Sequence, residues 1–231
     1  MADALRVLLE VGKADKRVVA GAADWPGLDR WGKTDVLALE KLAAYVPRYA
    51  DVARRAGMAG DFDRQSPQLA VVERYLGNSS TDFWGIAHVA SSLERQPLGG
   101  EDLERRLTLL QACWAYFDDA FASAPAELRH GPRGGGWTRD QLEGHVYVSE
   151  AGQMTRKVDV RTPRDMLFDP AGRAMHRQQT LEAIRAYHAD GRQARSWPIP
   201  FLIRRMAQHL LDHTWELQDR SILPTDALEA R

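Results

Sequence analysis

The chain has a single cysteine, Cys113, among its 231 residues. One cysteine excludes an internal disulfide framework and a metal site built from several cysteines. An excess of charge of either sign is also missing, since 31 basic residues face 32 acidic ones and the formal net charge is −1. A chain without basic excess lacks the electrostatic attraction that nucleic acids and anionic membranes provide. We therefore expect neither as a partner.

Long hydrophobic runs are absent as well. No segment reaches the roughly 20 consecutive apolar residues that a membrane-spanning helix needs. The N-terminus MADALRVLLEVGKADK has no basic start, and its apolar stretch is too short for a signal peptide. These features predict a cytoplasmic protein. Cys113 lies in the apolar stretch LLQACWAYF, which favours a buried side chain over a reactive thiol.

The sequence predicts a small β-β-α unit in residues 1–60. Two segments rich in β-branched residues, Leu5–Val11 and Arg17–Ala23, are joined by the polar stretch GKADK, which is typical of a β-hairpin. The stretch DWPGLDRWG then reads as a loop with a Pro-Gly turn signal, and Thr34 is placed to cap a helix that ends at Gly57. Pro47 lies inside this helix, so we expect a kink or a break there.

Residues 61–100 read as a connector, in which QLAVVERYLG fits either a strand or a short helix. Residues 101–222 are helical in pattern. One apolar stripe recurs at steps of three and four along the first helix: Leu103, Leu107, Leu110, Trp114, Phe117 and Phe121. Capping signals start the next two helices at Thr138 and Asp169, and the last helix covers roughly residues 201–220. Four amphipathic helices favour a mainly α protein built on a four-helix bundle.

Three histidines stand out in this helical part. His209 and His213 are four residues apart, so they point the same way along the apolar stripe of the last helix. His145 lies on the apolar side of the second predicted helix. Inward-facing imidazoles need partners, and two interpretations meet that need. Each ring makes an ordinary hydrogen bond, or all three bind one metal ion and leave a fourth position open, as in catalytic zinc sites.

Other polar groups near the histidines have two interpretations each. Glu216 lies close to the face of His213, where it could orient the imidazole, act as a base, or simply be solvated. Asp212 is turned away by about 100° and is expected to be solvated. The stretch GPRGGGWTRD could bind an anion through backbone N–H groups with Arg133 or Arg139, or be a flexible loop. Trp215 could line a substrate pocket or belong to the core.

The segments GWTRDQLEGHVYVSEAG and MAQHLLDHTWELQDR resemble the second and final helices of DinB-like (YfiT-like) four-helix bundle proteins. The resemblance covers residues 100–220. It implies a divalent metal, commonly zinc or nickel, bound by His145, His209 and His213, and a homodimer. It also implies thiol-dependent S-transferase or isomerase activity with a low-molecular-weight thiol. The N-terminal unit resembles HicB-like antitoxin folds, which are not part of the minimal DinB-like bundle.

Together these features predict a metal-dependent enzyme acting on a small-molecule substrate. A metal-bound thiol would support S-transfer or isomerisation, and a metal-bound water would support hydrolysis. The alternative is a non-enzymatic, stress-linked binding or regulatory module in which the histidine cluster is structural or vestigial.

Overall fold

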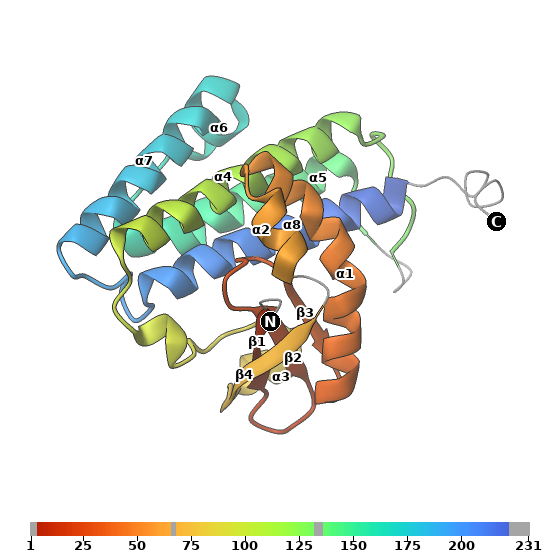
Figure 1. The fold of residues 1–231 in the computed structure, drawn as a ribbon. Helices are drawn as coiled ribbons and strands as arrows, with labels where there is room; N and C mark the ends of the chain where they lie inside the picture. The colour runs from red at the N-terminus through yellow and green to blue at the C-terminus, as the bar shows by residue number, and fades with distance from the viewer. Residues whose placement is uncertain (1–3, 66–67, 132–135, 222–231) are drawn as a thin grey trace.

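The computed structural model of the protein describes residues 4–65, 68–131 and 136–221. It is mainly helical, with one small sheet formed by the N-terminal part of the chain (Figure 1). The strands are β1 (Leu5–Val11), β2 (Val18–Ala22), β3 (Asp29–Gly32) and β4 (Leu69–Leu76). The helices are α1 (Asp35–Arg55), α2 (Ala59–Gln65), α3 (Ser79–Trp84), α4 (Gly100–Ser123), α5 (Arg139–Ser149), α6 (Arg164–Phe168), α7 (Pro170–Ala189) and α8 (Ile199–Ser221). None of the helices in these ranges is both long and apolar enough to cross a membrane.

The sheet is larger than the sequence predicts. The hairpin is confirmed, since β1 and β2 pair antiparallel with Val7 opposite Ala22. However, β3 forms inside the predicted loop and pairs with β2. Of the two alternatives for QLAVVERYLG the strand is confirmed, as β4, which pairs parallel with β1. The strand order is β3-β2-β1-β4. The N-terminal unit is therefore larger than the predicted β-β-α unit. Helices α1 and α2 belong to the connection that a parallel pair such as β1 and β4 requires.

Helix α1 packs against the sheet and is capped as predicted, with Thr34 Oγ1 accepting from the Leu37 amide at 3.3 Å. Pro47 lies inside α1 and the helix continues through it, so of the expected kink or break the break does not occur. A proline within a helix removes one backbone hydrogen bond. Val46 and Tyr49, on either side of Pro47, are buried, so the helix is held in place by packing around the proline.

The turn Trp25–Leu28 brings the N-terminal part against α8. The Leu28 amide donates to the Trp25 carbonyl at 3.1 Å, and Gly27 between them has a φ of +92°. A Cβ on Gly27 would also lie within 2.9 Å of the Ala207 Cβ on α8. Both the backbone angle and the close approach therefore require glycine.

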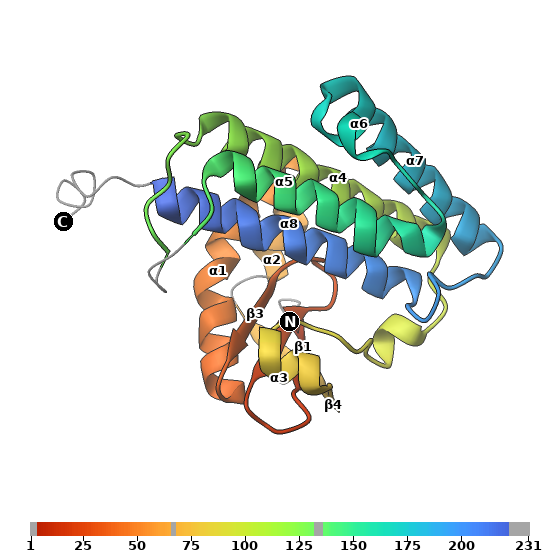
Figure 2. The same ribbon diagram turned by 180° about the vertical axis from the view of Figure 1, so that it is seen from behind.

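Helices α5 and α7 begin where the capping signals place them. Thr138 and Gln141 exchange hydrogen bonds at 3.0 and 3.3 Å, and Asp169 accepts from the Gly172 amide at 2.8 Å. Most of the predicted stripe on α4 is buried. Helix α8 contacts α4, α5 and α7, and Figure 2 shows α4, α5 and α8 running side by side. Helix α5 continues into a π-helical turn at Glu150–Met154, which the sequence did not predict.

A buried ion cluster joins α8 to the N-terminal part. Arg204 of α8 donates through Nε to Asp29 at 2.8 Å, and its Nη1 lies 3.3 Å from Glu94. All three side chains are buried. Removing a partner from such a cluster leaves an uncompensated charge in the interior, so this contact fixes α8 relative to the sheet.

Candidate metal centre

His145 of α5 and His209 and His213 of α8 come together where the two helices pack. One ring nitrogen from each lies within 4.8 Å of the other two. The ring centroids of His209 and His213 are 4.8 Å apart, and that of His145 is 5.2 and 4.9 Å from them. The structure thus brings the three histidines selected from the sequence into one cluster.

The spacing of the nitrogens suits a shared ion. The Nε2 atoms of His145 and His209 are 3.2 Å apart. Two nitrogens bound to one zinc ion at about 2.0–2.1 Å in a tetrahedron lie about 3.3 Å apart. The same distance also suits a single N–H···N hydrogen bond. A hydrogen bond would join only these two rings, whereas an ion would use a nitrogen from each of the three.

The surroundings keep two of the imidazoles neutral. Burial lowers the pKa of His145, and the neighbouring His213 lowers it further. Burial, followed by His213 and His145, holds the pKa of His209 well below its ordinary value. Neutral imidazole is the form that binds a metal ion, so these two rings are ready to act as ligands near pH 7.

Glu216 contacts the third histidine directly. Its Oε2 lies 3.0 Å from His213 Nδ1, and its Oε1 accepts from Arg220 Nη1 at 2.8 Å. Burial opposes ionisation of Glu216, but the contacts with His213 and Arg220 outweigh it and lower its pKa. A carboxylate at Nδ1 favours the tautomer that leaves Nε2 free for a metal. Of the roles considered from the sequence, this geometry favours orientation of the imidazole.

Arg220 is a residue that the sequence analysis missed. It donates through Nε to the Arg129 carbonyl at 2.7 Å and through Nη2 to the Trp137 carbonyl at 2.6 Å. These bonds tie α8 to the segments on both sides of the glycine-rich stretch and fix the cation beside Glu216. The available signal was its position four residues after Glu216, the spacing of a helical ion pair.

A cavity of about 490 Å³ opens beside His145. The Trp137 ring forms part of its wall and lies against His145, with centroids 4.5 Å apart. Val148 and Phe168 add apolar surface, and Arg164 is a cation at the same cavity. Trp137, Val148 and Phe168 are exposed although they are large and apolar. Exposed apolar side chains around a concave site are typical of ligand binding.

The remaining predicted residues lie elsewhere. Trp215 is two positions from His213, which turns it about 200° around the helix, and it is buried against Tyr45 with ring centroids 5.1 Å apart. Arg139 donates to Asp140 and to the Ala124 carbonyl, at 2.8 and 3.2 Å.

Arg133 lies outside the described residues. Asp212, expected to be solvated, instead pairs with the buried Arg30 at 2.5 Å.

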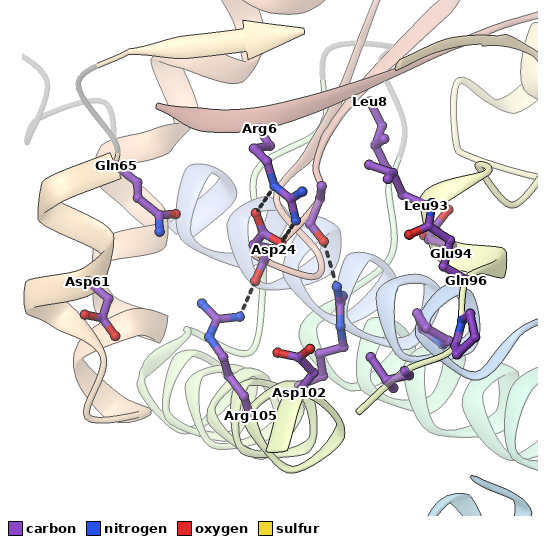
Figure 3. A pocket seen from close by; sticks show the side chains of 15 residues that line it. Arg6, Leu8, Asp24, Asp61, Gln65, Leu93, Glu94, Gln96, Asp102 and Arg105 are labelled. Atoms are coloured by element: carbon purple, nitrogen blue, oxygen red, sulfur yellow. Dashed lines mark hydrogen bonds and ion pairs between the residues drawn. The ribbon is translucent and has the colours of Figure 1, made fainter. Parts of the chain in front are cut away.

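Another cavity, of about 320 Å³, lies between β1, α2 and α4 (Figure 3). Arg6 donates to both carboxylate oxygens of Asp24 at 2.6 and 2.8 Å, and Arg105 donates to the Asp24 carbonyl at 2.6 Å. Burial opposes ionisation of Asp24, but Arg6 and the other arginines hold its pKa below its ordinary value. These guanidinium groups are engaged with the chain itself, so we interpret the contacts as an attachment of the sheet to α4.

A comparison of the chain with protein-family models, curated proteins and solved structures finds no match.

Proposed function

We propose that the protein is a metal-dependent enzyme in which His145, His209 and His213 bind a divalent cation, zinc or nickel. The observation that carries the proposal is the convergence of three imidazole nitrogens within 4.8 Å. The carboxylate of Glu216 on His213 supports it, because ligating histidines commonly bond to such a group. Three protein ligands leave a fourth position for substrate or solvent.

We also infer that α4, α5, α7 and α8 form the four-helix bundle of a DinB-like protein. The first segment that resembles this family spans the whole of α5 and the second lies within α8, and these are the helices that carry the histidines. Contacts of α8 with α4, α5 and α7 support the same arrangement. The family resemblance adds a low-molecular-weight thiol as co-substrate and a homodimer as the assembly.

The chemistry follows from the cation and from the groups around it. A bound divalent cation lowers the pKa of a coordinated thiol or water, so that a nucleophile forms near pH 7. Glu216 orients His213, and Trp137 shields one side of His145. The cavity beside His145 accepts the apolar part of a small substrate. A thiol would give S-transfer or isomerisation, and water would give hydrolysis.

Replacement of the native metal by Co²⁺ tests for an open coordination position. The visible absorption of Co²⁺ reports its ligands, so glutathione or azide added to the loaded protein should change the spectrum in a saturable way. The His209→Ala/His213→Ala variant should not show the spectrum of the wild type. A bound Co²⁺ that responds to no added ligand would instead support the structural, non-enzymatic alternative.

A further inference from the structure

A third cavity, of about 360 Å³, lies between the N-terminal part of the chain and α8. Its wall includes four aromatic side chains: Trp31, Tyr45, Trp84 and Trp215. Trp84 is 62% exposed and Trp215 is 1% exposed, so the aromatic lining extends from the surface into the interior. Aromatic walls with a few polar groups are typical of small-ligand sites.

The acidic residues of this cavity are already neutralised. Asp212 pairs with Arg30 at 2.5 Å, Asp219 with Arg48 at 2.9 Å, and Glu216 with Arg220 at 2.8 Å.

Lys41 differs from these residues, because it forms no ion pair within the described ranges and its Nζ lies 5.0 Å from the centre of the Trp31 ring. Burial lowers the pKa of Lys41 and the charge of Arg30 lowers it further, while the charge of Asp212 acts in the opposite direction. Because Asp212 is already paired with Arg30, the Lys41 ammonium has no ion-pair partner among the described residues.

Two buried donors of the same lining also lack acceptors. The Nε of Arg30 and the Nε1 of Trp215 have no hydrogen-bond partner among the described residues. Arg30 is 8% exposed, and its guanidinium lies between the rings of Tyr45 and Trp215, 3.8 and 4.0 Å from their centres. A buried donor without an acceptor costs about 1–3 kcal/mol. Both residues line the cavity, but the two nitrogen atoms are buried behind its wall, so they are not counted among the groups that meet a ligand there.

We propose that this cavity binds an aromatic carboxylate. The ring stacks on the Trp31 and Trp84 side chains, and the carboxylate pairs with the Lys41 ammonium. The volume lies at the small end of ligand sites, which span about 300–1,000 Å³, so it suits one ring or two fused rings. The site does not use the three histidines, and the Glu216–Arg220 pair belongs to both sites.

The probe is 2-naphthoate, titrated into the full-length protein by calorimetry. Two comparison compounds test the carboxylate and the aromatic ring separately. Neutral 2-naphthamide lacks the charge, and cyclohexanecarboxylate lacks the aromatic ring. Lys41→Met removes the cation, and Lys13→Met is its control at an exposed lysine outside the cavity. Trp84→Leu removes aromatic surface here, and Trp137→Leu does so at the cavity beside His145.

Saturable 2-naphthoate binding should weaken about tenfold in Lys41→Met and about fivefold in Trp84→Leu, with both controls unchanged. The two comparison compounds should bind more weakly than 2-naphthoate. Binding should persist in His209→Ala/His213→Ala and after chelation of metal, which separates this site from the metal centre. Absence of saturable binding, equal binding of the neutral amide, or loss of binding in Trp137→Leu alone would overturn the proposal.

Discussion

The carboxylate of Glu216 should strengthen metal binding through His213. It lies 3.0 Å from His213 Nδ1 and is held on its other side by Arg220 at 2.8 Å. Glu216→Gln keeps the shape and one acceptor oxygen but removes the charge, whereas Glu216→Ala removes both. Partners of ligating imidazoles typically contribute 10–100-fold to metal affinity. We therefore expect about a tenfold loss of Zn²⁺ affinity for Gln and up to about 100-fold for Ala, or about 1.4 and 2.7 kcal/mol.

The assay is a competition titration of metal-free protein with Zn²⁺ and a chromophoric chelator. Asp219→Asn is the matched control, because it removes a carboxylate charge from the same helix but its partner is Arg48. It should change the affinity less than twofold. In a His213→Ala background, Glu216→Gln should cause no further loss. Unchanged affinity in both Glu216 variants, together with a clear loss in His213→Ala, would refute the role of this carboxylate.

Three further predictions concern stability. Arg204→Met leaves two buried carboxylates without their cation, so urea denaturation should show a loss of about 3–5 kcal/mol; the exposed ion pair lost in Arg54→Met should cost under about 1 kcal/mol. Gly27→Ala should destabilise more than Gly57→Ala, because both have positive φ but only Gly27 has neighbouring atoms within 4 Å of an added Cβ. Burial, together with the charge of a nearby arginine, lowers the pKa of His88 from 6.5 to about 4. As the pH falls from about 6.5 to 4, the unfolded chain therefore binds the proton before the folded chain does, and the folded state loses stability. The urea midpoint should therefore drop more between pH 7 and 5 in the wild type than in His88→Gln, and equal drops would contradict this.

Local sequence signals predicted much of the fold. The hairpin depends on neighbouring segments, and the caps at Thr138 and Asp169 are contacts within four residues, so both can be read from short stretches. The strand β3 could not be predicted in this way, and for β4 the local pattern left a strand and a short helix equally open. β3 is four residues long and follows a Pro-Gly turn, and β4 pairs with a strand more than 50 residues earlier. Their conformation depends on partners that a local pattern does not reveal.

The same distinction applies to the candidate site. Helical periodicity placed His209 and His213 on one face and His145 on an inward side, and the structure brings them together. Contacts across the chain were missed, such as Trp137 against His145 and Arg220 on the Trp137 carbonyl. These contacts arise where the segment before α5 crosses α8, and no short motif encodes that crossing.

Metal content of the purified, untagged protein tests the three-histidine centre most directly. Elemental analysis should find about one zinc or nickel per chain in the wild type, filling the three-imidazole site. The His130→Ala/His188→Ala control should retain the metal, and His209→Ala/His213→Ala should lose it. Wild-type protein that binds no divalent metal even after reconstitution would contradict the centre. The contact between His145 and His209 would then be an ordinary hydrogen bond.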